Sequence, residues 1–307
     1  MTNFDFLLPF PEFAEFAESA ISAEHILHID RNACVISCRR SMEFAVKWMF
    51  DFDRDLDAAS RDNLVSLMRD KNFRNIVGDD VYYRMEYIRR LGNIAAHSGV
   101  LVTLEEAELC LENLHAFLDF LAYCYKEEYQ GTRFDKSLLE LTVHEALSFV
   151  SDASVEVKKT LSENDTLVSH LKVTRSNKAK NYHHLPVAHD ERKLRRLYVE
   201  LMLKDAGWVI GQSAVKKDDN YYLLDGKSVL ALVYVFSDIE SGKEGAIKLA
   251  RKIKSEQKSF LLVFLTNGIK TFVLEDFASS TRQVTGIYSK KNIKKYQHFK
   301  NNKNKTN

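Results

Sequence analysis

The chain has 307 residues, of which 45% are hydrophobic and 28% charged, and its formal net charge is +1. That length is enough for two ordinary domains with real hydrophobic cores. No window approaches about 18 uninterrupted apolar residues, and the start MTNFDFLLPFPEF lacks a basic region followed by a cleavable apolar stretch, so we expect neither a membrane span nor a signal peptide.

The small net charge conceals opposite charges in the two halves. Residues 1–132 contain 13 Lys and Arg against 23 Asp and Glu, whereas the remainder contains 31 against 20. We therefore expect two modules with different partners, the basic one facing nucleic acid. The four cysteines, at 34, 38, 110 and 124, lack the paired spacing of a metal site. They predict buried free thiols in a cytoplasmic protein, with no metal and no cofactor.

Residues 1–132 are predicted to form an all-helical bundle. Thr103 and Glu106 predict a capping box at the start of the last helix. Apolar residues recur at three- and four-residue spacing in five segments, which are FAEFAESAISAEHILHI, NACVISCRRSMEFAVKWMF, DNLVSLMRD, VYYRMEYIRRLGNIAAH and EEAELCLENLHAFLDFLAYCY. A bundle of about five helices follows.

Residues 133–189 are predicted to be a helical connector and linker. The segment KSLLELTVHEALSFVSDASVEVKKTLSENDTLVSHLKV can hold one long helix or two shorter ones. The following TRSNKAKNYHHLPVAHD is polar and contains a proline, which is typical of a linker.

Residues 190–290 are predicted to be an α/β domain with a mixed sheet. An amphipathic helix starts at Asp190 as N-cap and ends at Gly207. Short β-rich runs follow, with one helix, GKEGAIKLARKIKSEQ, among them; these runs are WVIGQ, NYYLL, VLALVYVF, SFLLVFLT, IKTFVLED and RQVTGIY. The apolar run from Val229 to Phe236 predicts a strand buried on both faces.

Residues 291–307 are predicted to be a frayed basic tail that attracts phosphate without specificity, since the last 19 residues hold seven lysines and no acid.

Two sets of segments carry a resemblance to a known family. The first set is NFDFL, CRRSMEFAVKWMF, DNLVSLM, IRRLGNIAAHS and LHAFLDFLAYCYKEEY; the second is RRLYVELMLKDAGW, NYYLLDGKSVLALV, LLVFLTNGIKTFVLED and RQVTGIYSKKNI. Together they resemble the N-terminal region of the R (HsdR) subunits of type I restriction enzymes, in which a helical domain of unknown function often precedes a restriction nuclease domain. The resemblance implies a restriction-endonuclease-like fold for the second half. We expect no counterpart of the ATP-driven motor of R subunits, and Gly226-Lys227-Ser228 is expected to be a hairpin turn rather than a phosphate-binding loop.

The resemblance also locates the positions of the family's metal site. The family nuclease holds Mg²⁺ with an Asp on one strand and a Glu-x-Lys on the next, and these positions fall on Asn220, Tyr234 and Phe236. An amide and two aromatic rings supply too little negative charge for a hard cation, so we expect a degenerate nuclease without deoxyribonuclease activity. A relocated acidic site stays open as an alternative, and its candidates are Asp218, Asp219, Asp225, Glu191, Asp238 and Glu240.

The first half contains a second constellation, formed by Arg90, Asn93 and His97. Seven residues are close to two helical turns, so Arg90 and His97 share a helix face with Asn93 between them. The spacing resembles the Arg-x(4–6)-His motif of HEPN ribonucleases, which implies metal-independent RNA cleavage and a homodimer. Two other interpretations stay open: a purely structural role, with His97 at the end of a helix, and the binding of a nucleotide or another ligand.

One further group of residues is a candidate for contact with DNA. It consists of Lys248, Arg251, Lys252, Lys254 and Lys258, on and just after one predicted helix.

The leading expectation is a protein related to restriction–modification or phage defence that binds DNA or restriction–modification subunits without cutting, and has no contact with a membrane. The alternative is a ribonuclease that uses Arg90 and His97.

Overall fold

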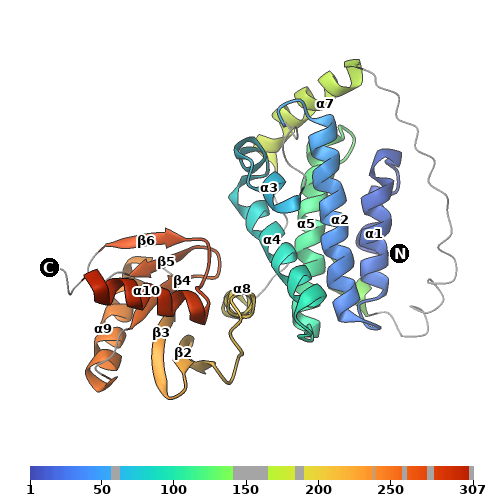
Figure 1. Cartoon of the computed structure of the whole chain (residues 1–307). Helices are drawn as coiled ribbons and strands as arrows, with labels where there is room; N and C mark the ends of the chain where they lie inside the picture. Colours follow the sequence, from blue (N-terminus) through green and yellow to red (C-terminus); the bar gives the residue numbers. More distant parts are fainter. Residues whose placement is uncertain are drawn as a thin grey trace. The chain divides into compact units, whose positions relative to one another are not determined.

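The computed structural model describes residues 1–56, 63–140, 165–183, 190–237, 239–257, 261–274 and 280–303. Within these ranges, the side chains of residues 165–170, 239–241 and 300–303 are not described. The chain divides into a helical unit, residues 1–188, and a sheet-containing unit, residues 189–307 (Figure 1). The predicted α+β layout with two domains is therefore confirmed.

The described part of the first unit is helical. Its elements are η1 (Asp5–Leu7), η2 (Pro11–Phe13), α1 (Ala14–His25), α2 (Arg31–Phe52), α3 (Leu64–Met68), α4 (Lys71–His97), α5 (Leu104–Tyr125), η3 (Lys136–Leu139), α7 (Asp165–Lys178) and η4 (Ala179–Asn181), where η marks a 3₁₀ helix. The helices α1 to α5 correspond to the five segments predicted from apolar spacing. Their buried faces form one core. The residues that α2 contributes to it include Cys34, Cys38 and Met42.

The central helix of the bundle is α5, which contacts α1, α2, α4 and α7. It is buried on nearly every side, as expected for a helix that is apolar around its circumference. The predicted capping box is present: the Thr103 N–H donates to the Glu106 carboxylate at 3.0 Å, and the Glu106 N–H donates to the Thr103 hydroxyl at 3.3 Å. The cap fixes the start of the helix around which the other helices pack.

The predicted linker is wrong for its first part. Residues that the polar composition assigned to a linker continue α7 and then form η4. Arg175 is only 7% exposed and donates to the Asp53 carboxylate at 2.8 Å, and the Tyr182 hydroxyl donates to Asp119 at 2.9 Å. Polar side chains thus attach this segment to the bundle through buried hydrogen bonds, which the apolar pattern of the sequence does not indicate. Residues 184–189 of the predicted linker lie outside the described residues.

Among its described residues, the second unit has one six-stranded sheet with strand order β1-β2-β3-β4-β5-β6. Its elements are α8 (Glu191–Asp205), β1 (Ala214–Lys217), β2 (Asn220–Asp225), β3 (Ser228–Val235), α9 (Ile239–Gln257), β4 (Leu262–Thr266), β5 (Thr271–Leu274), β6 (Thr281–Val284) and α10 (Lys290–Lys303). Only β3 and β4 pair in parallel among these strands, so the sheet is mixed as predicted. The predicted turn between β2 and β3 is also confirmed, because Asp225 pairs with Ser228 across Gly226 and Lys227. Gly226 has a φ of +60°, which a two-residue hairpin turn with glycine first requires.

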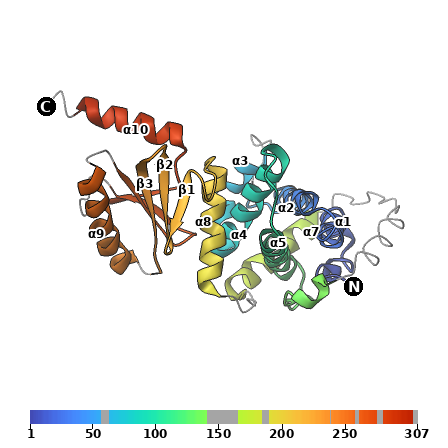
Figure 2. The same cartoon turned by 90° about the horizontal axis from the view of Figure 1, so that it is seen from below.

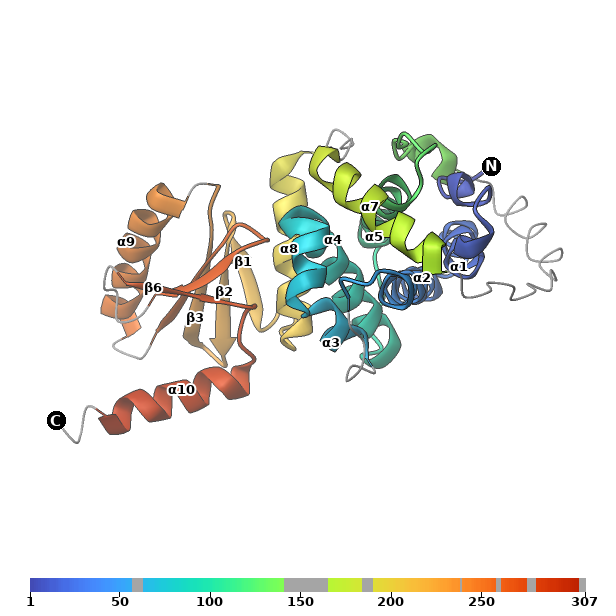
Figure 3. The ribbon, with the colours of Figure 1, turned by 90° about the horizontal axis from the view of Figure 1, so that it is seen from above.

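Helices cover both faces of this sheet. α8 and α10 contribute Val199, Leu203 and Ile293 to the core on one face, and α9 contributes Ala246 and Ala250 to the core on the other. Figures 2 and 3 show α9 and α8 on opposite sides of the strands. The apolar run that continues through β3 is therefore buried on both faces, as its sequence predicts.

The segment between α8 and β2 differs from the prediction. α8 starts at the predicted cap, where the Asp190 carboxylate accepts the Arg192 N–H at 2.9 Å. It ends at the predicted glycine, since Gly207 has a φ of +81°. The run WVIGQ is not a strand, because its one ladder contact is a bridge from Ile210 to Ala214 and the chain turns at Gly211. The first strand is instead AVKK, an edge strand that is too polar to detect by hydrophobic pattern.

The basic tail is not frayed over its described part, which forms α10. Ser289 accepts the N–H groups of Asn292 and Ile293 at the start of this helix. Ile293 is fully buried in the core on the α8 face. One apolar side chain at each turn is enough to dock a helix whose remaining surface is basic, so the composition of the segment concealed its packing.

Candidate nucleic-acid interface

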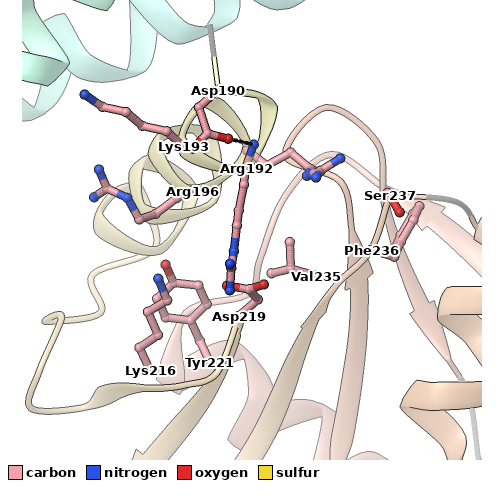
Figure 4. Close-up of a pocket in the computed structure, with 11 residues that line it drawn as sticks. Asp190, Arg192, Lys193, Arg196, Lys216, Asp219, Tyr221, Val235, Phe236 and Ser237 are labelled. Carbon is pink, nitrogen blue, oxygen red and sulfur yellow. Dashed lines mark hydrogen bonds and ion pairs between the residues drawn. The ribbon is translucent and has the colours of Figure 1, made fainter.

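A cavity of about 340 Å³ opens in the second unit, where β2 begins and β3 ends. The first two turns of α8 form one wall, and β1, β2 and β3 form the others (Figure 4). The cavity is lined by Asp190, Arg192, Lys193, Arg195, Arg196, Lys216, Asp219, Tyr221, Val235, Phe236 and Ser237. Five of these side chains are cationic and two are carboxylates, so the lining carries net positive charge.

The cationic side chains lie where helix stability does not favour them. Arg192 and Lys193 are in the first turn of α8, directly after the Asp190 cap. The amino end of a helix already carries partial positive charge, and cations there are unfavourable. The backbone N–H groups of the helix end and the side-chain cations therefore add to each other, and together they favour an anion in this cavity.

Two carboxylates orient the arginines of this cavity. Arg192 extends from α8 to Asp219 (Figure 4). Its Nε and Nη2 atoms donate to Oδ1 of Asp219 at 3.0 and 2.8 Å. The Asp219 hydrogen bond and charge raise the pKa of Arg192. Arg196 donates to Glu200 at 3.2 Å, and the same carboxylate accepts the Tyr221 hydroxyl at 2.8 Å. Burial, followed by the Glu200 charge, raises the pKa of Tyr221, so this phenol stays protonated and keeps Glu200 in place.

The three positions assigned to the family metal site come together on one sheet face. The pairing of Tyr221 with Val233 places Asn220 next to Tyr234, and Phe236 follows two residues later on the same side. The Asn220 side-chain oxygen accepts the Val235 N–H at 2.9 Å, so its acceptor already closes the end of the β2–β3 ladder.

Tyr234 and Phe236 point to α9 and pack against its glycines. A Cβ atom placed on Gly245 would lie 2.3 Å from the Tyr234 hydroxyl, and one placed on Gly242 would lie 2.5 Å from Cβ of Phe236. Both rings belong to the hydrophobic core between the sheet and α9. Among the described residues, no group of three His, Cys, Asp or Glu side chains is placed to hold a metal ion.

Most of the acids considered for a relocated site have other partners or are not described. Asp219 pairs with Arg192, and Asp225 binds Lys290 and Lys294 at 2.6 and 2.5 Å. Those two ammonium groups lower the pKa of Asp225. Of the other candidates, Glu191 lies 3.7 Å from Arg195, Asp218 is in the turn before β2, and Asp238 and the Glu240 side chain lie outside the described residues.

The second constellation lies on the last two turns of α4. His97 is its final residue and is exposed, whereas Asn93 and Arg90 are half-buried. Arg90 donates to the Glu86 carboxylate at 3.3 Å, and Arg89 donates to both oxygens of the same group. Burial alone would raise the pKa of Glu86, but the two arginines lower it.

Gly92, within this constellation, has a packing role. A Cβ atom at this position would lie 2.8 Å from both Cβ and Cδ of Arg39. The missing side chain lets the stem of Arg39 cross α4, and this contact brings α2 and α4 together. Part of the local sequence around Arg90 is therefore explained by helix packing.

The predicted basic stripe lies on α9. Lys248, Arg251, Lys252 and Lys254 are all exposed, and Lys258 lies outside the described residues. Lys248, Arg251 and Lys252 are on the side opposite the buried Ala246 and Ala250. The stripe is on the sheet face that α9 covers, and the cavity wall formed by α8 is on the other.

Sequence reasoning missed the cavity itself. The run Arg192-Lys193-Leu194-Arg195-Arg196, directly after a helix cap, was the available signal. Its cations were assigned to an ordinary amphipathic helix, and Lys216 lies on the strand that was not predicted. The cavity needs residues from four elements, which only the topology of the sheet brings together.

A family model described as a domain of unknown function (DUF4145) matches residues 22–137. This range lies in the helical unit and extends from α1 into η3. No curated protein and no solved structure shows a significant match to the chain. Among the helices of the described residues, none has the length and apolar character needed to cross a membrane.

Proposed function

We propose that the protein binds nucleic acid without cleaving it, through the cavity at the amino end of α8. The observation that carries this proposal is the cationic lining: five Lys and Arg residues line the cavity where β2 begins and β3 ends. Phosphate groups are the anions that such a lining of arginines and a helix end suits best. The resemblance to type I restriction R subunits supports a proposed role in restriction–modification or phage defence, with DNA or restriction–modification subunits as proposed partners.

The absence of cleavage follows from how the family metal positions are used. The Asn220 side-chain oxygen accepts a hydrogen bond from the Val235 N–H, and Tyr234 and Phe236 pack in the core against α9. No carboxylate stands at any of the three positions, and Mg²⁺ binding needs oxygen ligands with negative charge. Binding at this edge of the sheet is therefore proposed to depend on phosphate contacts rather than on a metal.

A comparison of two double variants tests the proposal. Lys193→Ala with Lys216→Ala removes two cations from the cavity, and Lys248→Ala with Lys252→Ala removes the same charge from α9. We expect the cavity variant to weaken the binding of a fluorescent DNA strand and to reduce the slope of log K against log salt by about 2, since each lost phosphate contact reduces it by about 1.

The opposite outcome would assign the DNA-binding surface to α9 instead of the cavity. A large loss in the α9 variant with an unchanged cavity variant assigns DNA binding to the stripe of Lys248, Arg251, Lys252, Lys254 and Lys258. No binding of DNA or RNA by the wild-type chain contradicts the proposal altogether. All four substituted lysines are on the surface, so both variants are expected to fold.

The alternative function is metal-independent RNA cleavage by Arg90, Asn93 and His97. The observation that favours it is the exposure of His97 on the helix face that also carries Arg90. The pairing of Arg90 with Glu86 counts against it, because a phosphate would have to compete with that carboxylate. RNA cleavage in excess EDTA that His97→Ala abolishes would establish this alternative, and a His97→Ala variant with unchanged activity would exclude it.

A further inference from the structure

The surface of α10 has two parallel rows of side chains at four-residue spacing. The first row is Lys290, Lys294 and His298, and the second is Lys291, Lys295 and Phe299. These six residues surround a shallow hollow on the surface. Phe299 is 63% exposed, and no acidic residue occurs from residue 290 to the end of the chain. Positive charge next to an exposed aromatic ring is a combination that single-stranded nucleic acids recognise.

The position of α10 is fixed from two sides. Ile293 is fully buried in the core on the α8 face. Lys290 and Lys294, in the first row, bind Asp225 at the end of β2. The second row therefore faces away from the core, because Lys291 and Lys295 lie on the side of the helix opposite the buried Ile293.

The cavity and α10 lie at the two ends of β2. Asp219, just before this strand, holds Arg192 of the cavity, and Asp225, its last residue, holds the lysines of α10. Asn220 and Asp225 are about 17 Å apart along an extended strand. α8 and α10 contribute to the core on the same face of the sheet, so both cationic surfaces belong to that face.

We infer that α10 is a second contact for one single-stranded nucleic acid whose first contact is the α8 cavity, an inference that rests on the proposed function. A single strand that stays stacked advances about 3.4 Å per nucleotide, so about five nucleotides connect the two surfaces, and an extended strand needs fewer. Lys291 and Lys295 bind phosphates, and the Phe299 ring stacks on a base. A cavity of about 340 Å³ has no room for a duplex, which favours a single strand as the occupant.

An anionic membrane is a weaker match to the same charge. A helix that lies on a bilayer buries an apolar face of its own in the lipid. Ile293 and Tyr296 of α10 are instead packed in the core of the second unit. Lysines and one exposed ring remain, and they provide charge without the apolar face.

Oligonucleotide length gives the test. The full chain is titrated with strands of roughly two and roughly twelve nucleotides, which respectively cannot and can connect surfaces about 17 Å apart. Lys291→Ala with Lys295→Ala is expected to weaken binding of the longer strand at least about tenfold and to change binding of the shorter strand by no more than about twofold. Phe299→Leu is expected to weaken the longer strand about fivefold, since stacking on an aromatic ring contributes about 1 kcal/mol or more.

The Asp225→Asn variant is expected to change the binding affinity in the opposite direction. It frees Lys290 and Lys294 from their carboxylate, so the longer strand is expected to bind severalfold more tightly. The charge-matched Lys248→Ala with Lys252→Ala variant is the control. If this control shows the same length-dependent loss as the α10 variant, the second contact is not α10.

The outcomes separate this inference from the proposed function. Equal losses for both lengths in the α10 variant, or no loss for either, overturn the second contact even when the cavity variant weakens both strands. A cavity variant that weakens neither strand contradicts the proposed function instead. Tighter binding of a duplex than of a single strand, or binding to anionic vesicles that the α10 variant abolishes, overturns the proposed occupant.

Discussion

Glu24 is a buried acid whose charged form is disfavoured by its burial in the folded protein. It is 3% exposed, and both of its carboxylate oxygens accept the Asn3 N–H at 3.1 Å. Burial raises its pKa to about 7, against the lowering effect of the hydrogen bonds from Asn3. The same segment is bound on its other side, since the Asn3 side chain exchanges hydrogen bonds with the backbone of Asp135. Glu24 therefore titrates where the N-terminal segment joins the bundle.

The pKa of Glu24 predicts a pH-dependent stability. The folded state binds the proton more tightly than the unfolded state, whose pKa is 4.5, so this contribution is complete below pH 4.5 and is lost as the pH rises through 7. The loss amounts to about 3 kcal/mol, at about 1.4 kcal/mol per pKa unit. Glu24→Gln cannot titrate, and the difference in unfolding free energy between wild type and variant should change by this amount between acidic and mildly alkaline pH.

Urea unfolding followed by far-ultraviolet circular dichroism measures this difference, because the helical unit dominates the signal. All other titrating groups are shared by the two proteins and cancel. Two pH profiles that run parallel would show that the Glu24 carboxyl is not perturbed.

Single residues also show what sequence could and could not reveal. The Asp190 and Thr103 caps were predictable because a cap needs a particular residue at one local position. The role of Asn220 was not, since its acceptor is used by Val235, a residue 15 positions away on the next strand. Local rules identify local hydrogen bonds, whereas the cavity lining depends on strand register.

At the scale of elements, α9 depends on two glycines that face the sheet. Gly242 and Gly245 leave space for Phe236 and Tyr234, respectively. Glycine is normally about 1 kcal/mol worse than alanine inside a helix, so alanine would be stabilising if only helix propensity mattered. The close ring contacts reverse this expectation.

Gly242→Ala is expected to destabilise the second unit by about 1–3 kcal/mol, because the added methyl group meets Cβ of Phe236, close to the backbone. Urea unfolding monitored by Trp208 fluorescence in a Trp48→Phe background reports on this unit alone. Glu244→Ala, on the exposed side of α9, is the matched control, with an expected change within about 0.5 kcal/mol. A stabilised Gly242→Ala variant would contradict the packing described for Phe236.

The elements divide into those with strong and weak sequence signals. α1 to α5, β3 and β4 were predictable because long apolar periodicities and continuous apolar runs mark buried helices and central strands. β1 and α10 were not, since an edge strand and a surface helix bury few side chains, and lysines dominate their composition. The start of the linker was misjudged for a related reason: Arg175 attaches it through an ion pair with Asp53.

At the scale of the whole molecule, charge is divided between the two ends of the chain. The first 132 residues are acidic, and the basic residues of the second unit line the α8 cavity, α9 and α10. A cationic surface is suited to holding a phosphate backbone in place, and the described residues of this unit include no group placed to hold a metal ion. The helical unit, which matches a domain of unknown function, supplies the chain with a separate core.

The most direct measurement is the affinity of the full chain for a single-stranded oligonucleotide in excess Mg²⁺ and in excess EDTA, with the integrity of the strand checked at the end. The proposed cavity predicts binding in both conditions, of similar strength once ionic strength is matched, and an intact strand. Binding that requires Mg²⁺, or a strand that is cut only when Mg²⁺ is present, would contradict the account and point to a working metal site.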